Sequence, residues 1–111
     1  MLNLNQYYGL AELIDEIRTQ MEQGDHFCLY GDDESDLDLA RRYFIAAYPD
    51  VEDDSEVYPA AVQREGLSYL YSGQQLADVV WVLAQRKPDA RPEDYVRALN
   101  HYQHHDTFLE I

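Results

Sequence analysis

The sequence has few bases, one cysteine and no long apolar run. Only 8 of its 111 residues are Lys or Arg, against 22 Asp or Glu, so the formal net charge is −14 with neutral histidines. Proteins that bind nucleic acids or anionic membranes present basic patches to phosphate groups. The shortage of bases therefore argues against direct DNA or RNA binding and against binding to an anionic membrane surface.

Cysteine is nearly absent as well. Cys28 has no second cysteine with which to form an intramolecular disulfide or a CxxC zinc motif. The first residues lack the basic region and uninterrupted apolar region of a secretion signal, and no segment approaches the roughly 20 apolar residues that span a bilayer. We therefore expect a cytoplasmic protein with no membrane partner.

Length and composition predict one folded domain. A chain of 111 residues suits a single core, and its 46% apolar and 13% aromatic content is too high for a disordered acidic tail. No internal repeat, low-complexity segment or flexible linker divides the sequence. We therefore predict that residues 1–111 form a single domain.

The spacing of apolar residues predicts four helices. In the first, apolar residues recur three and four apart as far as Met21, and Gly24 suits a left-handed C-terminal stop. Ser72 and Gln75 have the capping-box spacing at the start of the third, which we expect to be the core helix. The predicted helices cover residues 9–23, residues 60–65 between Pro59 and Gly66, a segment after Ser72, and a segment that Pro92 opens.

Short apolar and aromatic runs predict three strands, at residues 26–30, 41–48 and 67–71. The segment 41–48 also fits a helix, but its aromatic and β-branched residues and the following Pro49 favour a strand. The predicted fold is α+β, a small single domain with about a three-stranded sheet packed with four helices. The expected order of elements is α-β-β-α-β-α-α.

Acidic residues are concentrated in the first half of the chain. Residues 1–56 hold 15 acidic and 3 basic residues, whereas residues 57–111 hold 7 and 5. An ordinary solvated surface mixes both signs because clustered like charges repel, so the clustering favours a binding face, although two polar loops remain the alternative. Two runs flank the predicted strand 41–48: Asp32, Asp33, Glu34, Asp36 and Asp38, then Asp50, Glu52, Asp53, Asp54 and Glu56.

Tyrosines accompany these acidic runs. The chain has 10 tyrosines, and several of them border the runs. Tyrosine combines a large contact area with a polar tip and is enriched in protein interfaces. We therefore predict an acidic face that binds a basic protein rather than a small ligand, with Tyr43 and Tyr48 as aromatic anchors.

Catalytic, metal and phosphate motifs are missing from the sequence. Neither acidic run has the glycine and terminal glutamate of an EF-hand, and the glycines form no phosphate-binding loop. Cys28 lies in an apolar run and is predicted to be a buried hydrophobic residue. We expect no enzymatic activity and no cofactor. One alternative is a small metal-dependent enzyme that uses the C-terminal cluster of His101, His104, His105 and Asp106.

Four motifs in the second half of the chain carry a resemblance to a family. They are Asp50-Val51-Glu52-Asp53-Asp54, Gly66-Leu67-Ser68-Tyr69, Asp78-Val79-Val80 with Gln85, and Ala98-Leu99-Asn100-His101-Tyr102 through Asp106-Thr107-Phe108. With these motifs the chain resembles an uncharacterised domain family found among bacterial immunity proteins, which are partners of contact-dependent growth inhibition and related polymorphic toxins. The resemblance covers roughly residues 26–111. Trp81, His104 and His105 stand where other members are more often polar.

The resemblance implies an antitoxin that binds and neutralises a cognate toxin. Many such toxins are nucleases with cationic clefts, which an acidic inhibitor can occupy by mimicking phosphate charge. Together with the charge distribution, this predicts an immunity protein that binds a basic toxin domain, a nuclease, and blocks its active site or its access to substrate. A second alternative is a nucleic-acid mimic that inhibits a DNA-binding or defence protein.

Overall fold

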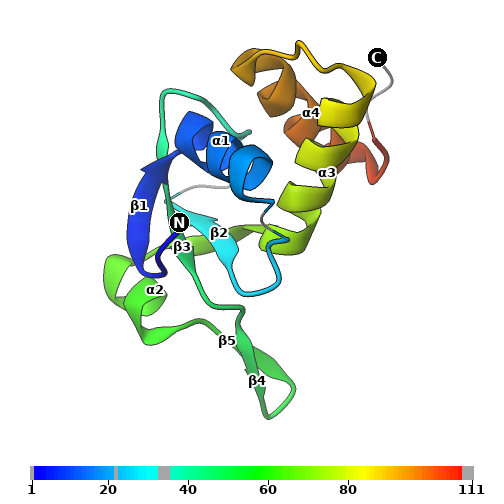
Figure 1. The fold of residues 1–111 in the computed structure, drawn as a ribbon. Coiled ribbons are helices and arrows are strands. Elements are labelled where there is room, and N and C mark those ends of the chain that lie inside the picture. Colours follow the sequence, from blue (N-terminus) through cyan, green and yellow to red (C-terminus); the bar gives the residue numbers. More distant parts are fainter. Residues whose placement is uncertain (1, 22, 33–35, 109–111) are drawn as a thin grey trace.

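The computed structural model describes residues 2–21, 23–32 and 36–108. Helices and strands in this part form an α+β domain, which confirms the predicted fold class (Figure 1). In chain order the elements are β1 (Gln6–Gly9), α1 (Leu10–Gln20), β2 (Cys28–Gly31), β3 (Arg42–Ala46), β4 (Asp50–Glu52), β5 (Ser55–Val57), α2 (Ala60–Glu65), β6 (Ser68–Ser72), α3 (Gly73–Arg86) and α4 (Pro92–His105).

Four of the strands form one antiparallel sheet in the spatial order β1-β3-β2-β6. The predicted strands 26–30, 41–48 and 67–71 are confirmed as β2, β3 and β6, and all four predicted helices are present. The sheet has one strand more than predicted. β1 pairs with β3, where Tyr7 lies opposite Phe44, and its Gln-Tyr-Tyr-Gly sequence shows no alternation that would reveal it beforehand.

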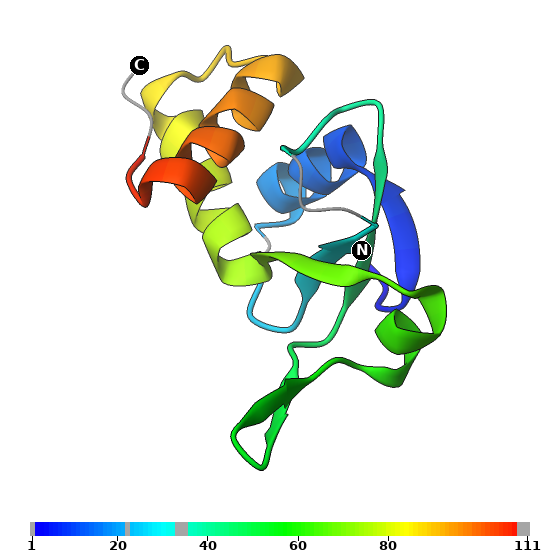
Figure 2. The same ribbon diagram turned by 180° about the vertical axis from the view of Figure 1, so that it is seen from behind.

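The two faces of the sheet pack against different elements. Successive residues of a strand point to opposite faces. Tyr43 and Ile45 therefore enter the main core, which also contains the buried side chains of α1, α3 and α4. Tyr30 and Phe44 point the other way and pack with Val62 of the short helix α2. Figures 1 and 2 show the three long helices gathered away from α2.

The first helix ends earlier than predicted. It was expected to reach residue 23, but it ends at Gln20, and Met21 takes the left-handed conformation with a φ of 55°. Gly24 instead permits a close backbone contact, because its φ is +73° and a Cβ there would lie 1.9 Å from the carbonyl oxygen of Gly73. A Cβ on Gly73 would in turn lie 2.2 Å from the carbonyl oxygen of Phe27. Both positions require glycine.

The hydroxyl of Tyr48 closes this contact between the α1–β2 connection and α3. It donates to the carbonyl oxygen of Gly24 at 2.9 Å and accepts from the backbone N–H of Gln74 at 3.2 Å. Tyr48 thereby supplies a hydrogen bond to one of the N–H groups that the first turn of a helix leaves without an internal partner.

Ser72 caps the same helix, as its spacing from Gln75 predicts. The Ser72 Oγ accepts from the backbone N–H of Gln75 at 3.0 Å. The N–H of Gly73 bonds to the carbonyl oxygen of Phe27 at 2.9 Å. The N–H groups of the first three residues of α3 therefore all have acceptors within the protein, and these bonds define the residue at which the helix begins.

The strands β4 and β5 form a separate hairpin that projects beyond the four-stranded sheet (Figures 1 and 2). Its turn residues Asp53 and Asp54 have φ values of 50° and 64°. Positive φ at both central residues is what a two-residue hairpin turn requires. No strand was predicted in this segment, which was assigned to an acidic binding face with a polar loop as the alternative. Its hairpin signal was two short runs, each containing a valine, separated by a two-residue turn.

Helix length in the described part of the chain also bears on membranes. No helix there is both long and apolar enough to cross a lipid bilayer.

Replacing Tyr48 by Phe tests the contact at the start of α3. The substitution keeps the ring and removes both hydrogen bonds of the hydroxyl, so we expect the free energy of unfolding to fall by about 1–2 kcal/mol. Urea unfolding monitored by circular dichroism measures the change. Tyr102→Phe is the matched control, because the Tyr102 hydroxyl makes no hydrogen bond within the described residues, and its effect should stay within about 0.5 kcal/mol. Equal losses in both variants would contradict the role assigned to Tyr48.

Candidate functional site

The β4–β5 hairpin carries the second acidic run into solvent. Its five acidic residues, Asp50, Glu52, Asp53, Asp54 and Glu56, are all exposed. Within the described part of the chain, none of these carboxylates makes an ion pair or a hydrogen bond. Their mutual repulsion is therefore relieved only by solvent and salt. An approaching cationic surface would relieve it further.

The hairpin also exposes an apolar side chain among these charges. Val51 is 71% exposed and lies opposite Glu56 in the hairpin register. Asp50 and Glu52 point to the other side of β4, opposite Val57 and Ser55. The hairpin thus combines carboxylates on both sides with one exposed aliphatic contact.

The first acidic run lies at the opposite end of β3, and Asp33 and Glu34 of this run fall outside the described residues. Asp32 pairs with Arg41. Asp36 Oδ1 lies 2.6 Å from Nε2 of His104 on α4. In contrast to the hairpin, the described carboxylates of this run have partners within the protein, and Asp38 accepts from the backbone N–H of Ala40 at 2.8 Å.

Asn100 of α4 fixes the backbone of this first run. Its Oδ1 accepts from the N–H of Leu37 at 2.8 Å, and its Nδ2 donates to the carbonyl oxygen of Leu37 at 3.1 Å. The Leu37 side chain is itself buried in the main core. One side chain thus pairs with both backbone groups of Leu37, as a neighbouring strand would. This role of Asn100 was not predicted, because nothing in the local sequence links it to a residue 63 positions away.

The two predicted aromatic anchors differ in position. The prediction for Tyr43 is wrong: its side chain is completely buried in the main core, and its hydroxyl accepts from the N–H of Asp38 at 2.9 Å. The alternation of β3 decides this, because it turns Tyr43 toward the helices. Tyr48 is half-buried beside the hairpin, with its hydroxyl bonded internally. Of the two predicted aromatic anchors, therefore, only Tyr48 remains a predicted partner contact, and only through its ring.

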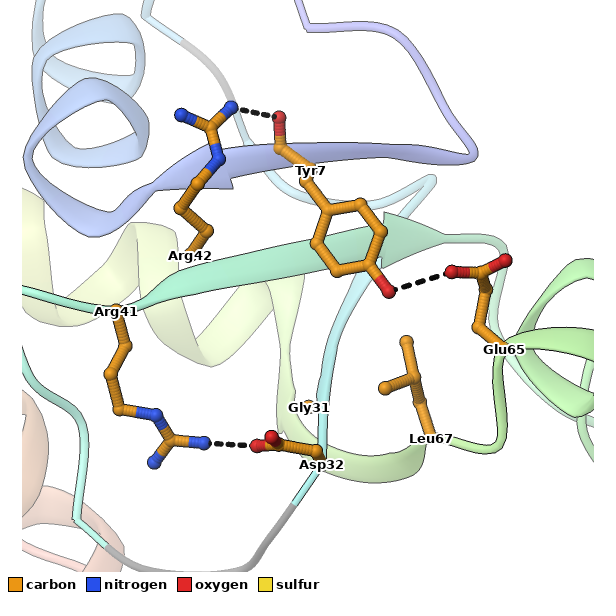
Figure 3. Close-up of a pocket in the computed structure, with 7 residues that line it drawn as sticks. All are labelled: Tyr7, Gly31, Asp32, Arg41, Arg42, Glu65 and Leu67. Carbon is orange, nitrogen blue, oxygen red and sulfur yellow. Dashed lines mark hydrogen bonds and ion pairs between the residues drawn. The ribbon is translucent and has the colours of Figure 1, made fainter.

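A pocket of about 400 Å³ lies between the first acidic run and α2. Figure 3 shows Arg41 and Arg42 on one side, Glu65 on the other, and the ring of Tyr7 between them. Its polar groups bind one another. Arg42 donates to the carbonyl oxygen of Tyr7 at 3.0 Å, and the Tyr7 hydroxyl donates to Glu65 at 2.8 Å.

The pocket is a surface hollow in which two basic lining residues balance two acidic ones. Partial burial and the adjacent Glu65 carboxylate raise the pKa of Tyr7, so its hydroxyl stays a proton donor. Asp32 and Arg41 complete a second pair across the pocket (Figure 3). The described residues that line it include no serine, cysteine or histidine, so the pocket presents none of the usual nucleophile and base pairs.

The C-terminal histidines do not assemble into a three-ligand centre. The rings of His101 and His105 stack with centroids 4.4 Å apart, whereas His104 is engaged with Asp36. Among the residues that the structure describes, no group of three or more His, Cys, Asp or Glu side chains is placed to hold a metal ion. The arrangement of this cluster therefore gives no support to the metal-dependent alternative.

Cys28 is fully buried on β2, as predicted for a small hydrophobic residue. Burial raises the pKa of its thiol from the ordinary value of 9.0 to about 11. Burial likewise raises the pKa of the neighbouring Tyr69 to about 12. Both groups remain neutral near pH 7, and a protonated, buried thiol is a poor nucleophile.

Comparison with known protein families matches residues 9–111 to the family described as "Domain of unknown function (DUF7716)". The match covers most of the chain, which therefore belongs to this family. Neither the curated proteins nor the solved structures contain a significant match.

Replacing Asn100 tests how α4 holds the first acidic run. Asn100→Ala removes both bonds to the half-buried backbone of Leu37, so we expect unfolding to become easier by about 2–3 kcal/mol. Hydrogen exchange should show a large loss of protection at the Leu37 amide. Asn100→Asp is the matched control, because it keeps the acceptor for that amide and loses only the donor. Unchanged protection at Leu37 in Asn100→Ala would contradict this assignment.

The reactivity of Cys28 provides a separate test. At pH 8 the raised pKa leaves the folded thiol protonated, so a disulfide reagent should react at least about 100-fold more slowly with native than with urea-unfolded protein. Because the unfolded thiol ionises near 9.0 and the folded one near 11, this group's contribution to stability is complete below pH 9 and is lost as the pH rises toward 11. Comparable rates in both states would make Cys28 an accessible nucleophile.

Proposed function

We propose that this member of the DUF7716 family is a cytoplasmic immunity protein that neutralises a cognate basic toxin domain. The observation that carries the proposal is the β4–β5 hairpin, a projecting element with five exposed carboxylates that make no ion pair or hydrogen bond within residues 2–21, 23–32 and 36–108. The sequence resemblance to immunity proteins of contact-dependent growth inhibition and related toxin systems supports the same class. The proposal assigns the protein no catalytic step and no cofactor.

The hairpin is the element that approaches the toxin first in this proposal. It is a projecting two-stranded element (Figure 1), and the register of its strands places acidic residues on both sides and in the turn. A cationic cleft that binds phosphates attracts such a group at long range, which raises the association rate. At contact, arginine side chains of the toxin would pair with hairpin carboxylates, and forked pairs would be the strongest. Val51 supplies an apolar contact at the centre of the charged group.

The first acidic run has a different role in this proposal. Asp32 already pairs with Arg41 and Asp36 is in contact with His104, so a toxin contact there must compete with these side chains. These carboxylates therefore contribute to the long-range field more than to the tightest contacts. Blocking of the active site or of substrate access follows from the hairpin entering a cleft that otherwise binds phosphates.

We propose a nuclease as the toxin because its substrate carries regularly spaced phosphate charges. A cleft built for that polyanion contains clustered Lys and Arg side chains. The hairpin presents a matching cluster of negative charge without any base. Competition between hairpin and nucleic acid for one cationic surface is then the mechanism of inhibition.

Neutralising the hairpin tests this proposal. The variant Glu52→Gln, Asp53→Asn and Asp54→Asn removes three charges, and asparagine tolerates the left-handed turn positions. Binding to the toxin domain encoded beside this protein is measured by stopped-flow association and calorimetry at several salt concentrations. We expect association to slow by about tenfold or more, with a smaller salt dependence, because electrostatic steering is weakened.

A charge-matched control separates local from global effects. The variant Asp15→Asn, Asp89→Asn and Glu93→Gln removes three exposed charges outside the hairpin and should change the association rate by less than about threefold. Absence of binding to that toxin domain, or binding that is indifferent to salt and to the hairpin variant, would overturn the proposal. Binding of a host DNA-binding protein instead would favour the nucleic-acid mimic.

A further inference from the structure

A second pocket, of about 350 Å³, lies between α3 and the connection from α1 to β2. Four of its residues follow one face of α3 at helical spacing, and two come from the connection. No lysine, arginine or histidine is among these lining residues, in contrast to the pocket beside Arg41. The lining residues are Gln23, Asp25, Gln74, Ala77, Asp78 and Trp81.

The negative charge of this pocket is only partly compensated. Asp78 is exposed and makes no ion pair or hydrogen bond within the part of the chain that the structure describes. Asp25 lies 3.5 Å from Nδ1 of His26, and its side chain is 64% exposed. Two carboxylates thus face a pocket whose described lining residues include no basic group.

Trp81 and Ala77 give the pocket its shape. Trp81 is half-buried, packs against the main core and stands one helical turn after Asp78 and Ala77. The face of an indole ring attracts cations more strongly than any other aromatic side chain. Ala77 is buried, and its small side chain leaves room between Gln74 and Trp81. An aromatic wall beside two carboxylates is a suitable site for an organic cation.

Tyr48 connects the pocket to the base of the hairpin. Gln74 lines the pocket, and its N–H bonds to the hydroxyl of Tyr48. Gly24, between the lining residues Gln23 and Asp25, accepts from the same hydroxyl. Tyr48 precedes β4 by two residues. The pocket and the base of the hairpin therefore adjoin the same tyrosine.

We propose that this pocket receives an arginine side chain of the protein partner. A guanidinium group is planar, so it can stack on the Trp81 ring while its fork of N–H donors pairs with a carboxylate. The amide oxygens of Gln23 and Gln74 can accept further N–H groups, which a lysine ammonium would satisfy less completely. The inference rests on the proposed function for the identity of the partner, but the chemistry of the pocket does not depend on it.

The test uses a single capped arginine and no toxin. Trp81 is the only tryptophan of the chain, so selectively excited fluorescence reports on this pocket alone. Titration with N-acetyl-arginine methylamide at low salt should give a saturable change with a dissociation constant in the millimolar range. The capped lysine should bind more weakly, and the isosteric but neutral capped citrulline should not bind. Amide shifts in NMR spectra should map to residues 23–25 and 74–81.

Matched variants connect the signal to the carboxylates. Asp78→Asn should weaken capped arginine by about fivefold, as expected for the loss of one charged pair. Asp25→Asn should weaken it in the same direction and serves as the second variant. Asp89→Asn removes the same charge from the exposed α3–α4 connection and should leave the affinity within about twofold.

Three outcomes would overturn the proposed arginine site: no saturable signal from capped arginine, equal binding of capped citrulline, or equal effects of Asp78→Asn and Asp89→Asn. These outcomes are distinguishable from failure of the proposed function. A toxin domain that does not bind would overturn the immunity role while the titration still reports on the pocket. If the pocket does not bind arginine, the proposed contacts of the hairpin with the toxin are unaffected.

Discussion

The close contact between Gly24 and Gly73, closed by the Tyr48 hydroxyl, is the constraint on which the rest of the structure depends. It joins the connection after α1, the first turn of α3 and the segment that leads into the hairpin. Two glycines are needed because a Cβ at either position would overlap a backbone carbonyl. The contact fixes the first turn of α3 against the α1–β2 connection, beside the segment from which the hairpin leaves the domain.

The two acidic runs form two different kinds of surface. The first run is held by α4, through the two bonds from Asn100 to Leu37 and the contact of His104 with Asp36. The hairpin projects beyond the sheet, and within the described residues its carboxylates have no ion pair or hydrogen bond. A high net charge is thus divided into a part that is compensated within the fold and a part that is available to a cation. The proposed function depends on the second part.

The hairpin and the Trp81 pocket complement each other in the proposed interface. Clustered carboxylates raise the association rate through long-range attraction but discriminate little between cationic partners. A shaped pocket with an aromatic wall can discriminate, because a buried planar cation must match it in geometry as well as charge. The hydrogen bond between Gln74 and Tyr48 connects the pocket to the segment that leads into the hairpin. Membership of the DUF7716 family is compatible with either role and assigns neither.

The sequence by itself determined the fold class, the four helices, three of the four sheet strands, the capping of α3 by Ser72 and the burial of Cys28. These follow from local periodicity, capping spacing and composition, which act within a few residues. Only the tertiary structure decided that β1 joins the sheet, that Tyr43 faces the core, that Asn100 holds Leu37, and that Trp81 lines a pocket with Asp25. Each of these depends on which face of an element meets a distant segment. Net charge and residue spacing do not predict which distant segments meet.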